Sequence, residues 1–135
     1  MANYTCASRT NYFRVTDENA YAKLFTNLIS DDPIEDMSET RDGVLYHAFG
    51  CFSPVDFQVN DDENNMDAFA RMLQQILPEN EAFILLEAGN EKLRYIVGMA
   101  TIITKTTIKC LSLEDMALET CKNVLGNDFT TKMSY

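Results

Sequence analysis

Two long apolar runs joined by a short turn constrain the fold of this 135-residue chain more than any other feature. The runs cover residues 82–88 and 93–104. Between them, Gly89-Asn90-Glu91-Lys92 begins with a residue that tolerates positive φ. Apolar runs of this length on either side of such a turn predict a β-hairpin. We therefore expect an antiparallel sheet that contains this hairpin.

Three stretches have the apolar spacing of amphipathic helices, each with a recognisable start or stop signal. The first helix is expected at residues 17–29, with Thr16 as its N-cap. The second is expected at residues 66–77 and ends before Pro78. The third should begin after Ser112, which has capping-box spacing to Asp115, and end at Gly126. Further strands are expected at residues 10–15, 44–52, 57–59 and 106–111. The strand at 44–52 is apolar on both faces, which favours a place inside the sheet.

The order of these elements predicts an α+β fold, a largely antiparallel sheet with helices packed on one face. If residues 57–59 pair with a neighbouring strand, the first part of the chain has the βαββαβ order of a ferredoxin-like arrangement. The C-terminal hairpin and helix would then be additions to it. A length of 135 residues fits a single domain with one core.

The net charge of −10 is confined to one segment. Residues 31–67 hold eleven acids and one base, whereas the other 98 residues hold ten of each. We therefore describe residues 1–135 as one α+β domain that carries an acidic insert at 31–67.

Two clusters of acids lie within the insert. Asp32-Pro33-Ile34-Glu35 has the N-cap, N1 proline and N3 acid of a short helix. In that helix Asp32, Glu35, Asp36 and Glu39 would share a face with roughly one charge per 2.6 Å, against about 1.7 Å for duplex DNA and 3.4 Å for each strand. The second cluster, Asp61-Asp62-Glu63 with Asp67, precedes the next helix, where acids favour the helix dipole.

The insert allows two interpretations. Acidic runs commonly solvate loops, and acids at helix starts stabilise those helices. Alternatively, the insert binds a basic protein groove, because a like-charged surface would repel nucleic acid and attract a protein built to hold it. A binding surface would make partner affinity strongly salt-dependent, whereas a solubilising patch would tolerate neutralisation.

We expect neither a metal site, nor a cofactor, nor catalysis. An EF-hand loop begun at Asp61 would need Gly in place of Met66 and Glu in place of Met72, so only a loose cation site stays open. His47 and Cys51 would be about 13 Å apart along a strand, too far for a nucleophile and its base. An apolar setting makes His47 more typical of a hydrogen-bonded core residue than of a catalyst.

Cys6, Cys51, Cys110 and Cys121 have neither zinc-binding nor disulfide-framework spacing, so we expect reduced thiols in a cytoplasmic protein. The longest apolar stretch, residues 95–103, is about half of a membrane span, which favours a soluble chain that does not engage a membrane. We expect a monomer or a small homo-oligomer.

Direct nucleic-acid binding is disfavoured, because basic residues outside the insert are matched by acids. Arg14, Arg94 and Lys105 could line one sheet face beside Tyr12 and Tyr95, although exposed strand faces with paired charges are the alternative meaning.

A short acidic α+β chain without a catalytic motif resembles the small inhibitors that phages, plasmids and conjugative elements carry against host defences, including anti-restriction and anti-CRISPR proteins. The segments T-N-Y-F-R-V and L-E-A-G-N-E-K-L-R-Y also resemble parts of mobile-element proteins from Gram-positive bacteria. The resemblance implies an inhibitory protein and assigns no role to single residues.

The sequence thus leads to one hypothesis and two alternatives. The hypothesis is a non-enzymatic inhibitor whose insert occupies the nucleic-acid groove of a host defence nuclease. Its predicted partner-binding residues are Asp32, Glu35, Asp36, Glu39, Asp61, Asp62 and Glu63. The first alternative is an immunity or adaptor protein that binds a basic partner such as a toxin. The second is a structural protein that self-associates through hydrophobic strand edges.

Overall fold

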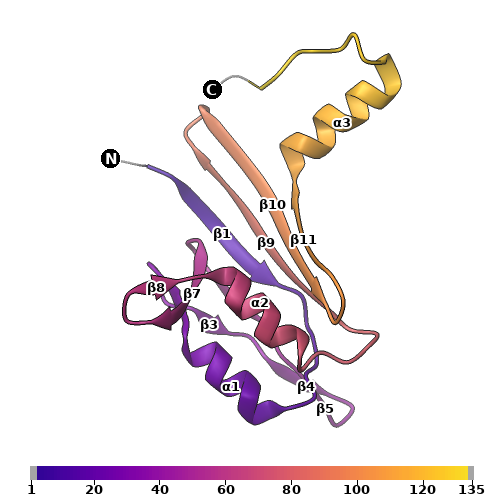
Figure 1. The fold of residues 1–135 in the computed structure, drawn as a ribbon. Coiled ribbons are helices and arrows are strands. Elements are labelled where there is room, and N and C mark those ends of the chain that lie inside the picture. The colour runs from indigo at the N-terminus through magenta and orange to yellow at the C-terminus, as the bar shows by residue number, and fades with distance from the viewer. Residues whose placement is uncertain (1–2, 134–135) are drawn as a thin grey trace.

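A six-stranded antiparallel sheet organises the protein, described by a computed structural model over residues 3–133 (Figure 1). Its strand order is β11-β10-β9-β1-β6-β3. The strands are β1 (Thr5–Thr10), β3 (Glu35–Asp36), β6 (Phe49–Cys51), β9 (Ala82–Glu91), β10 (Tyr95–Thr104) and β11 (Ile108–Ser112). The predicted hairpin is confirmed as β9 and β10, the two longest strands. Its turn lies later than predicted, because Gly89, Asn90 and Glu91 are paired within β9 and the positive φ occurs at Lys92.

The rest of the chain forms two small sheets and three helices. One sheet joins β2 (Leu28–Ser30), β7 (Val55–Asn60) and β8 (Glu63–Asn64), and the other pairs β4 (Glu39–Arg41) with β5 (Val44–Tyr46). The helices are α1 (Glu18–Thr26), α2 (Met66–Gln74) and α3 (Leu113–Leu125). The α+β class is therefore confirmed.

Helices α1 and α2 lie on one face of the large sheet and enclose the core with it (Figure 1). Phe83 of β9 is fully buried there, and its ring contacts those of Phe13, Phe49 and Phe69. We call this the inner face. The N-cap side chains of α1 and α2 are those of Asp17 and Asn65. The N-cap of α1, expected at Thr16, therefore lies one residue later.

The first strand of the sheet lies earlier than predicted. β1 ends at Thr10, and beyond it, within residues 11–15, only Phe13 forms a β-bridge, an isolated one to His47. The inward side chains of β1 are the small Cys6, Ser8 and Thr10. Ser8 donates a hydrogen bond to the carbonyl oxygen of Ser53, so its buried hydroxyl is paired. These residues give no apolar alternation, and the sequence pattern therefore concealed the strand.

The strand predicted at 44–52 is split. Residues 44–46 form β5, in a hairpin with β4, whereas Phe49–Cys51 forms β6 inside the large sheet. The segment predicted at 57–59 is confirmed as part of β7, but it pairs with β2 and β8 instead of entering the large sheet. The βαββαβ order is nevertheless present as β1, α1, β3, β6, α2 and β9, with β1 between β6 and β9.

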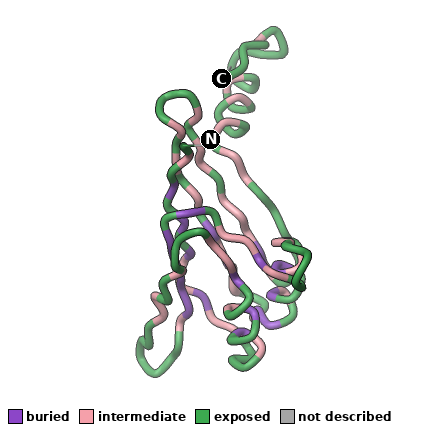
Figure 2. Tube along the Cα trace, turned by 90° about the vertical axis from the view of Figure 1, so that its left-hand side faces the viewer, coloured by how far each residue is buried: buried purple, intermediate pink, exposed green. Residues whose placement is uncertain are grey.

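The opposite face of the large sheet, which we call the outer face, is covered by neither α1 nor α2. Residues opposite one another on antiparallel strands point to the same face. Phe83 and Leu85 of β9 point inward, so Leu86 and Ala88 of the same strand point outward. Their partners on β10, Ala100 and Gly98, lie on the same outer face. α3 extends beyond the end of β11, and none of its residues, all of them described, is buried (Figures 1 and 2).

Candidate acidic interface

The eleven acids of the insert are displayed on the surface. All are exposed except Asp56, which is half-buried. The seven acids predicted as partner-binding residues are all among the exposed ones. The structure therefore makes each of them accessible to a partner, although not in the predicted arrangement.

The helix predicted at residues 32–39 does not form. Glu35 and Asp36 instead make up β3, which pairs with Gly50 and Phe49 of β6. Successive side chains of a strand point to opposite faces, so Glu35 and Asp36 diverge. At about 3.3 Å per residue, the four acids from Asp32 to Glu39 give roughly one charge per 6 Å. This density is below that of a single DNA strand, about one per 3.4 Å.

The first cluster ends at the β4–β5 hairpin, where the one base of the insert is engaged. Arg41 forms an ion pair with Glu39, and its guanidinium lies over the rings of Tyr12 at 4.5 Å and Tyr46 at 5.8 Å. The turn of the hairpin contains Asp42 and Gly43, both with positive φ. The one base of the insert is therefore engaged by Glu39 and by two tyrosine rings.

The second cluster occupies the β7–β8 turn. Asp61 and Asp62 form the turn itself, where the Asp62 amide donates to the side chain of Asn60, and Glu63 begins β8. Asp31, which follows β2, and Asp56 of β7 line one shallow hollow together with Asn64. Acids from both halves of the insert therefore lie close together beside the small three-stranded sheet.

Asp36 is the acid of the insert with the most local support. Its carboxylate accepts hydrogen bonds from the Ser38 amide at 3.0 Å and the Ser38 hydroxyl at 2.6 Å. These bonds, helped by nearby His47, hold the pKa of Asp36 below its usual value. Asp36 therefore stays ionised at neutral pH, with two of its acceptor positions already occupied.

His47 lies beneath this part of the insert as a packed residue. It is buried, its Nε2 lies 2.6 Å from a Glu18 carboxylate oxygen, and its ring lies 4.1 Å from that of Tyr21. Burial and the nearby charges of Asp36 and Glu18 raise the pKa of Tyr21. The interpretation of His47 as a hydrogen-bonded core residue is confirmed.

The thiols do not approach His47 in any described contact. Cys51 is buried and contacts the hydroxyl of Ser30 and the carbonyl of Ser53, whereas Cys6 is buried with its thiol pKa raised first by burial and then by Glu87. Residues 3–133 contain no group of three or more His, Cys, Asp or Glu side chains placed to hold a metal ion. No helix in this range is long and apolar enough to cross a membrane.

The basic patch considered from the sequence does not assemble. Arg94 lies over Tyr95 at the β9–β10 turn, whereas Arg14 pairs with Glu81 near the opposite end of these strands. Arg14 is paired, as the alternative meaning expects, but neither Arg14 nor Glu81 lies in a strand.

Sequence reasoning missed the exposed apolar surface on the outer face. The signal was present, because β9 and β10 are apolar on both faces and such strands are normally covered on both. No family model matches the chain, and comparisons with curated proteins and with solved structures give no significant match.

Proposed function

We propose that this chain is a cytoplasmic, non-enzymatic inhibitor whose acidic insert binds the basic nucleic-acid groove of a host defence nuclease, as an anti-restriction or anti-CRISPR protein does. The observation that carries the proposal is the uncompensated charge of the insert. Among residues 3–133 the ion pairs are Arg14–Glu81, Arg41–Glu39 and His47–Glu18, so Glu39 is the one acid of the insert with a cation partner.

Unpaired acids repel one another, and this repulsion destabilises the compact state unless a partner neutralises it. Ten carboxylates without a cation partner, on the segment from Asp31 to Asp67, would regain that loss against a cationic surface. Glu35, Asp36, Asp56 and Glu63 belong to strands, and the other acids lie in turns, loops and the start of α2. A groove built to hold the phosphates of nucleic acid has the cationic charge that this segment lacks.

The spacing of about 6 Å per charge along residues 32–39 changes the form of the proposal. The carboxylates of the insert are too widely spaced to match the phosphates of DNA one by one. The insert would therefore inhibit by being attracted to the groove and blocking it, and not by placing a carboxylate in each phosphate-binding site. Affinity should consequently fall with salt while tolerating the loss of any single acid.

The test compares two variants with the same change in charge. D32N/D61N/D62N neutralises three exposed acids of the insert and leaves Asp36 and Glu39 with their internal partners. E79Q/E91Q/D128N neutralises three acids that lie outside both the insert and α3. Each tagged protein is used to capture partners from bacterial lysate at low and moderate salt. A captured nuclease is then assayed for DNA binding with each protein added.

We expect the original protein and the outside variant to capture one nuclease and to block its DNA binding, with capture weakening as salt rises. The insert variant should lose at least tenfold in both. Equal capture by all three proteins, or none by any, would reject a binding role for the insert. Capture of a basic toxin with no effect on a nuclease would favour the immunity alternative.

A further inference from the structure

We propose that two copies of this chain form a homodimer in which α3 of each copy covers the outer sheet face of its partner. This inference concerns a different surface from the acidic insert, and it holds or fails independently of the proposed inhibition. It rests on an exposed apolar sheet face, an exposed apolar helix stripe and the charges that each one carries.

The outer face is apolar where it meets α3. Leu86 is 53% exposed and Ile96 is 52% exposed, and both belong to the outer face by the pairing of β9 with β10. A hollow of about 370 Å³ opens where this face meets the start of α3. Apart from Glu87, its lining is apolar: Leu86, Ala88, Gly98, Met99, Ala100, Leu111, Leu113 and Met116.

The helix has an apolar stripe that its own chain covers only at the start. Leu113, Met116 and Val124 lie at positions i, i+3 and i+11, on one side of the helix, and are 62%, 49% and 76% exposed. Leu113 and Met116 border the hollow on the sheet, and the Leu113 side chain lies 3.1 Å from where a Cβ of Gly98 would be, but Val124 does not line this hollow. An amphipathic helix of this kind is stable chiefly when its apolar face is packed.

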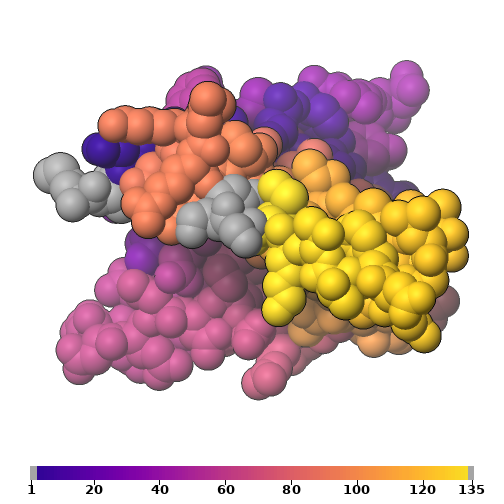
Figure 3. Space-filling model, turned by 90° about the horizontal axis from the view of Figure 1, so that it is seen from above, coloured from indigo at the N-terminus to yellow at the C-terminus, as the bar shows by residue number. Residues whose placement is uncertain are grey.

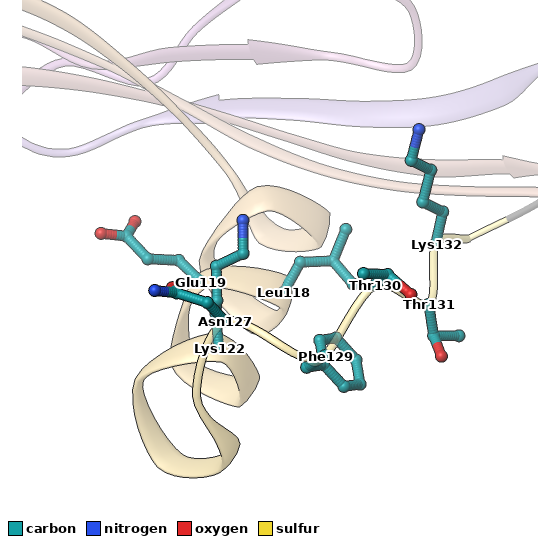
Figure 4. Close-up of a pocket in the computed structure, with 8 residues that line it drawn as sticks. All are labelled: Leu118, Glu119, Lys122, Asn127, Phe129, Thr130, Thr131 and Lys132. Atoms are coloured by element: carbon teal, nitrogen blue, oxygen red, sulfur yellow. The ribbon is translucent and has the colours of Figure 1, made fainter.

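The chain brings only the first turn of α3 against its own outer face. Ser112 is both the last residue of β11, paired with Met99, and the N-cap of α3, so no loop residue remains to reverse the direction. The helix and the segment after it form a separate lobe beside the β9–β10 hairpin (Figure 3). The C-terminal segment covers another side of α3, where Phe129 and Leu118 line a hollow of about 450 Å³ (Figure 4).

Charge favours a second copy as the occupant. The outer face carries three charged side chains, Arg9 and Lys109 near β9 and β10, and Glu35 on the edge strand β3, farthest from α3. The part formed by β1, β9, β10 and β11 therefore carries cations alone. α3 carries Glu114, Asp115 and Glu119 against Lys122, a net charge of −2. The helix of one copy therefore complements the sheet of another both in polarity and in sign.

The exposed area is a substantial part of what a dimer uses. Leu86, Ile96, Leu113, Met116 and Val124 are each 49–76% exposed. At about 80–100 Å² for each such side chain, they present roughly 400–500 Å² of apolar surface. This is at least half of the about 800 Å² per partner of a standard interface, and polar rim atoms supply the rest. An exposed apolar surface of this size is often functional.

The first test is the solution mass by sedimentation equilibrium over a range of concentrations. The original protein should reach twice the 15.3 kDa chain mass. L86D and V124D change exposed side chains on the sheet and the helix, and each should raise the dimer dissociation constant at least tenfold. F52D, at a residue that is 77% exposed and outside this surface, should have no effect. Circular dichroism checks that every variant is folded.

Mixing L86D with V124D tests the reciprocal arrangement. The mixed dimer has one intact contact, the helix of the L86D copy on the sheet of the V124D copy, so the mixture should contain more dimer than either variant alone. A monomeric original protein at about 100 μM would overturn the proposal, since a standard interface binds far below that concentration. Dimerisation unaffected by either substitution, or a mixture no better than its components, would also overturn it.

Discussion

Replacing Phe83 by Ala is the most direct test of the core that positions both proposed surfaces. Phe83 is fully buried, and its ring centroid lies 5.1 Å from that of Phe13, 5.6 Å from Phe69 and 6.1 Å from Phe49. Losing a buried Phe costs about 3–5 kcal/mol through lost burial and the cavity left behind. Because a domain of this size is stable by about 5–15 kcal/mol, F83A should lose about a fifth or more of its stability.

The assay is urea unfolding followed by circular dichroism, with all proteins at one concentration because self-association adds to apparent stability. With a denaturant slope of about 2 kcal/mol per molar urea, the F83A midpoint should fall by roughly 2 M. F52A is the matched control, because Phe52 is 77% exposed and its loss should change stability by at most about 0.5 kcal/mol. A loss below about 1 kcal/mol for F83A, or equal losses for both variants, would refute this account of the core.

Three further predictions follow from single sites. Because the pKa of Asp36 is lowered, its carboxylate stabilises the folded state above the unfolded pKa of about 4, and that contribution is lost as pH falls through the lowered value. D36N should therefore be less stable than the original protein at pH 7 and closer to it at pH 3, by thermal unfolding; an equal difference at both pH values would contradict this. A Cβ on Gly89 would lie 2.3 Å from a backbone oxygen of β1, so G89A should lose about 1–3 kcal/mol in urea unfolding. Exposed Cys110 should react rapidly with a thiol reagent and buried Cys6 only on unfolding, as peptide mass spectrometry would show; early labelling of Cys6 would argue against its burial.

Local signals in the sequence were sufficient for the C-terminal part of the fold. The hairpin follows from two apolar runs and a turn, and α3 follows from Ser112, whose side chain accepts from the Asp115 amide as the capping-box spacing predicts. These elements depend on residues close together in the chain. The hairpin pattern and the capping-box spacing do not show which part of the protein packs against these elements. The uncovered outer face was therefore not predictable from these two signals.

Tertiary pairing overrode the local signal in the acidic insert. Asp32-Pro33 has the order of a helix start, yet Glu35 and Asp36 pair with Gly50 and Phe49 as an edge strand. The exposure of the acids was predictable, because an unpaired charge is costly to bury. Their relative placement was not, since it depends on backbone bonds to β6, more than ten residues away.

The central position of β1 has a consequence for the order of events during synthesis. β1 is made first, but its neighbour β9 pairs Asn90 with Thr5, 85 positions later in the chain. At about 5–20 residues per second, the ribosome needs roughly 4–17 s after completing the start of β1 to supply that partner. During this interval one edge of β1 has no native strand beside it. The nascent chain can therefore complete its sheet only after most of the protein has emerged, and the rate of folding is set by that distant pairing.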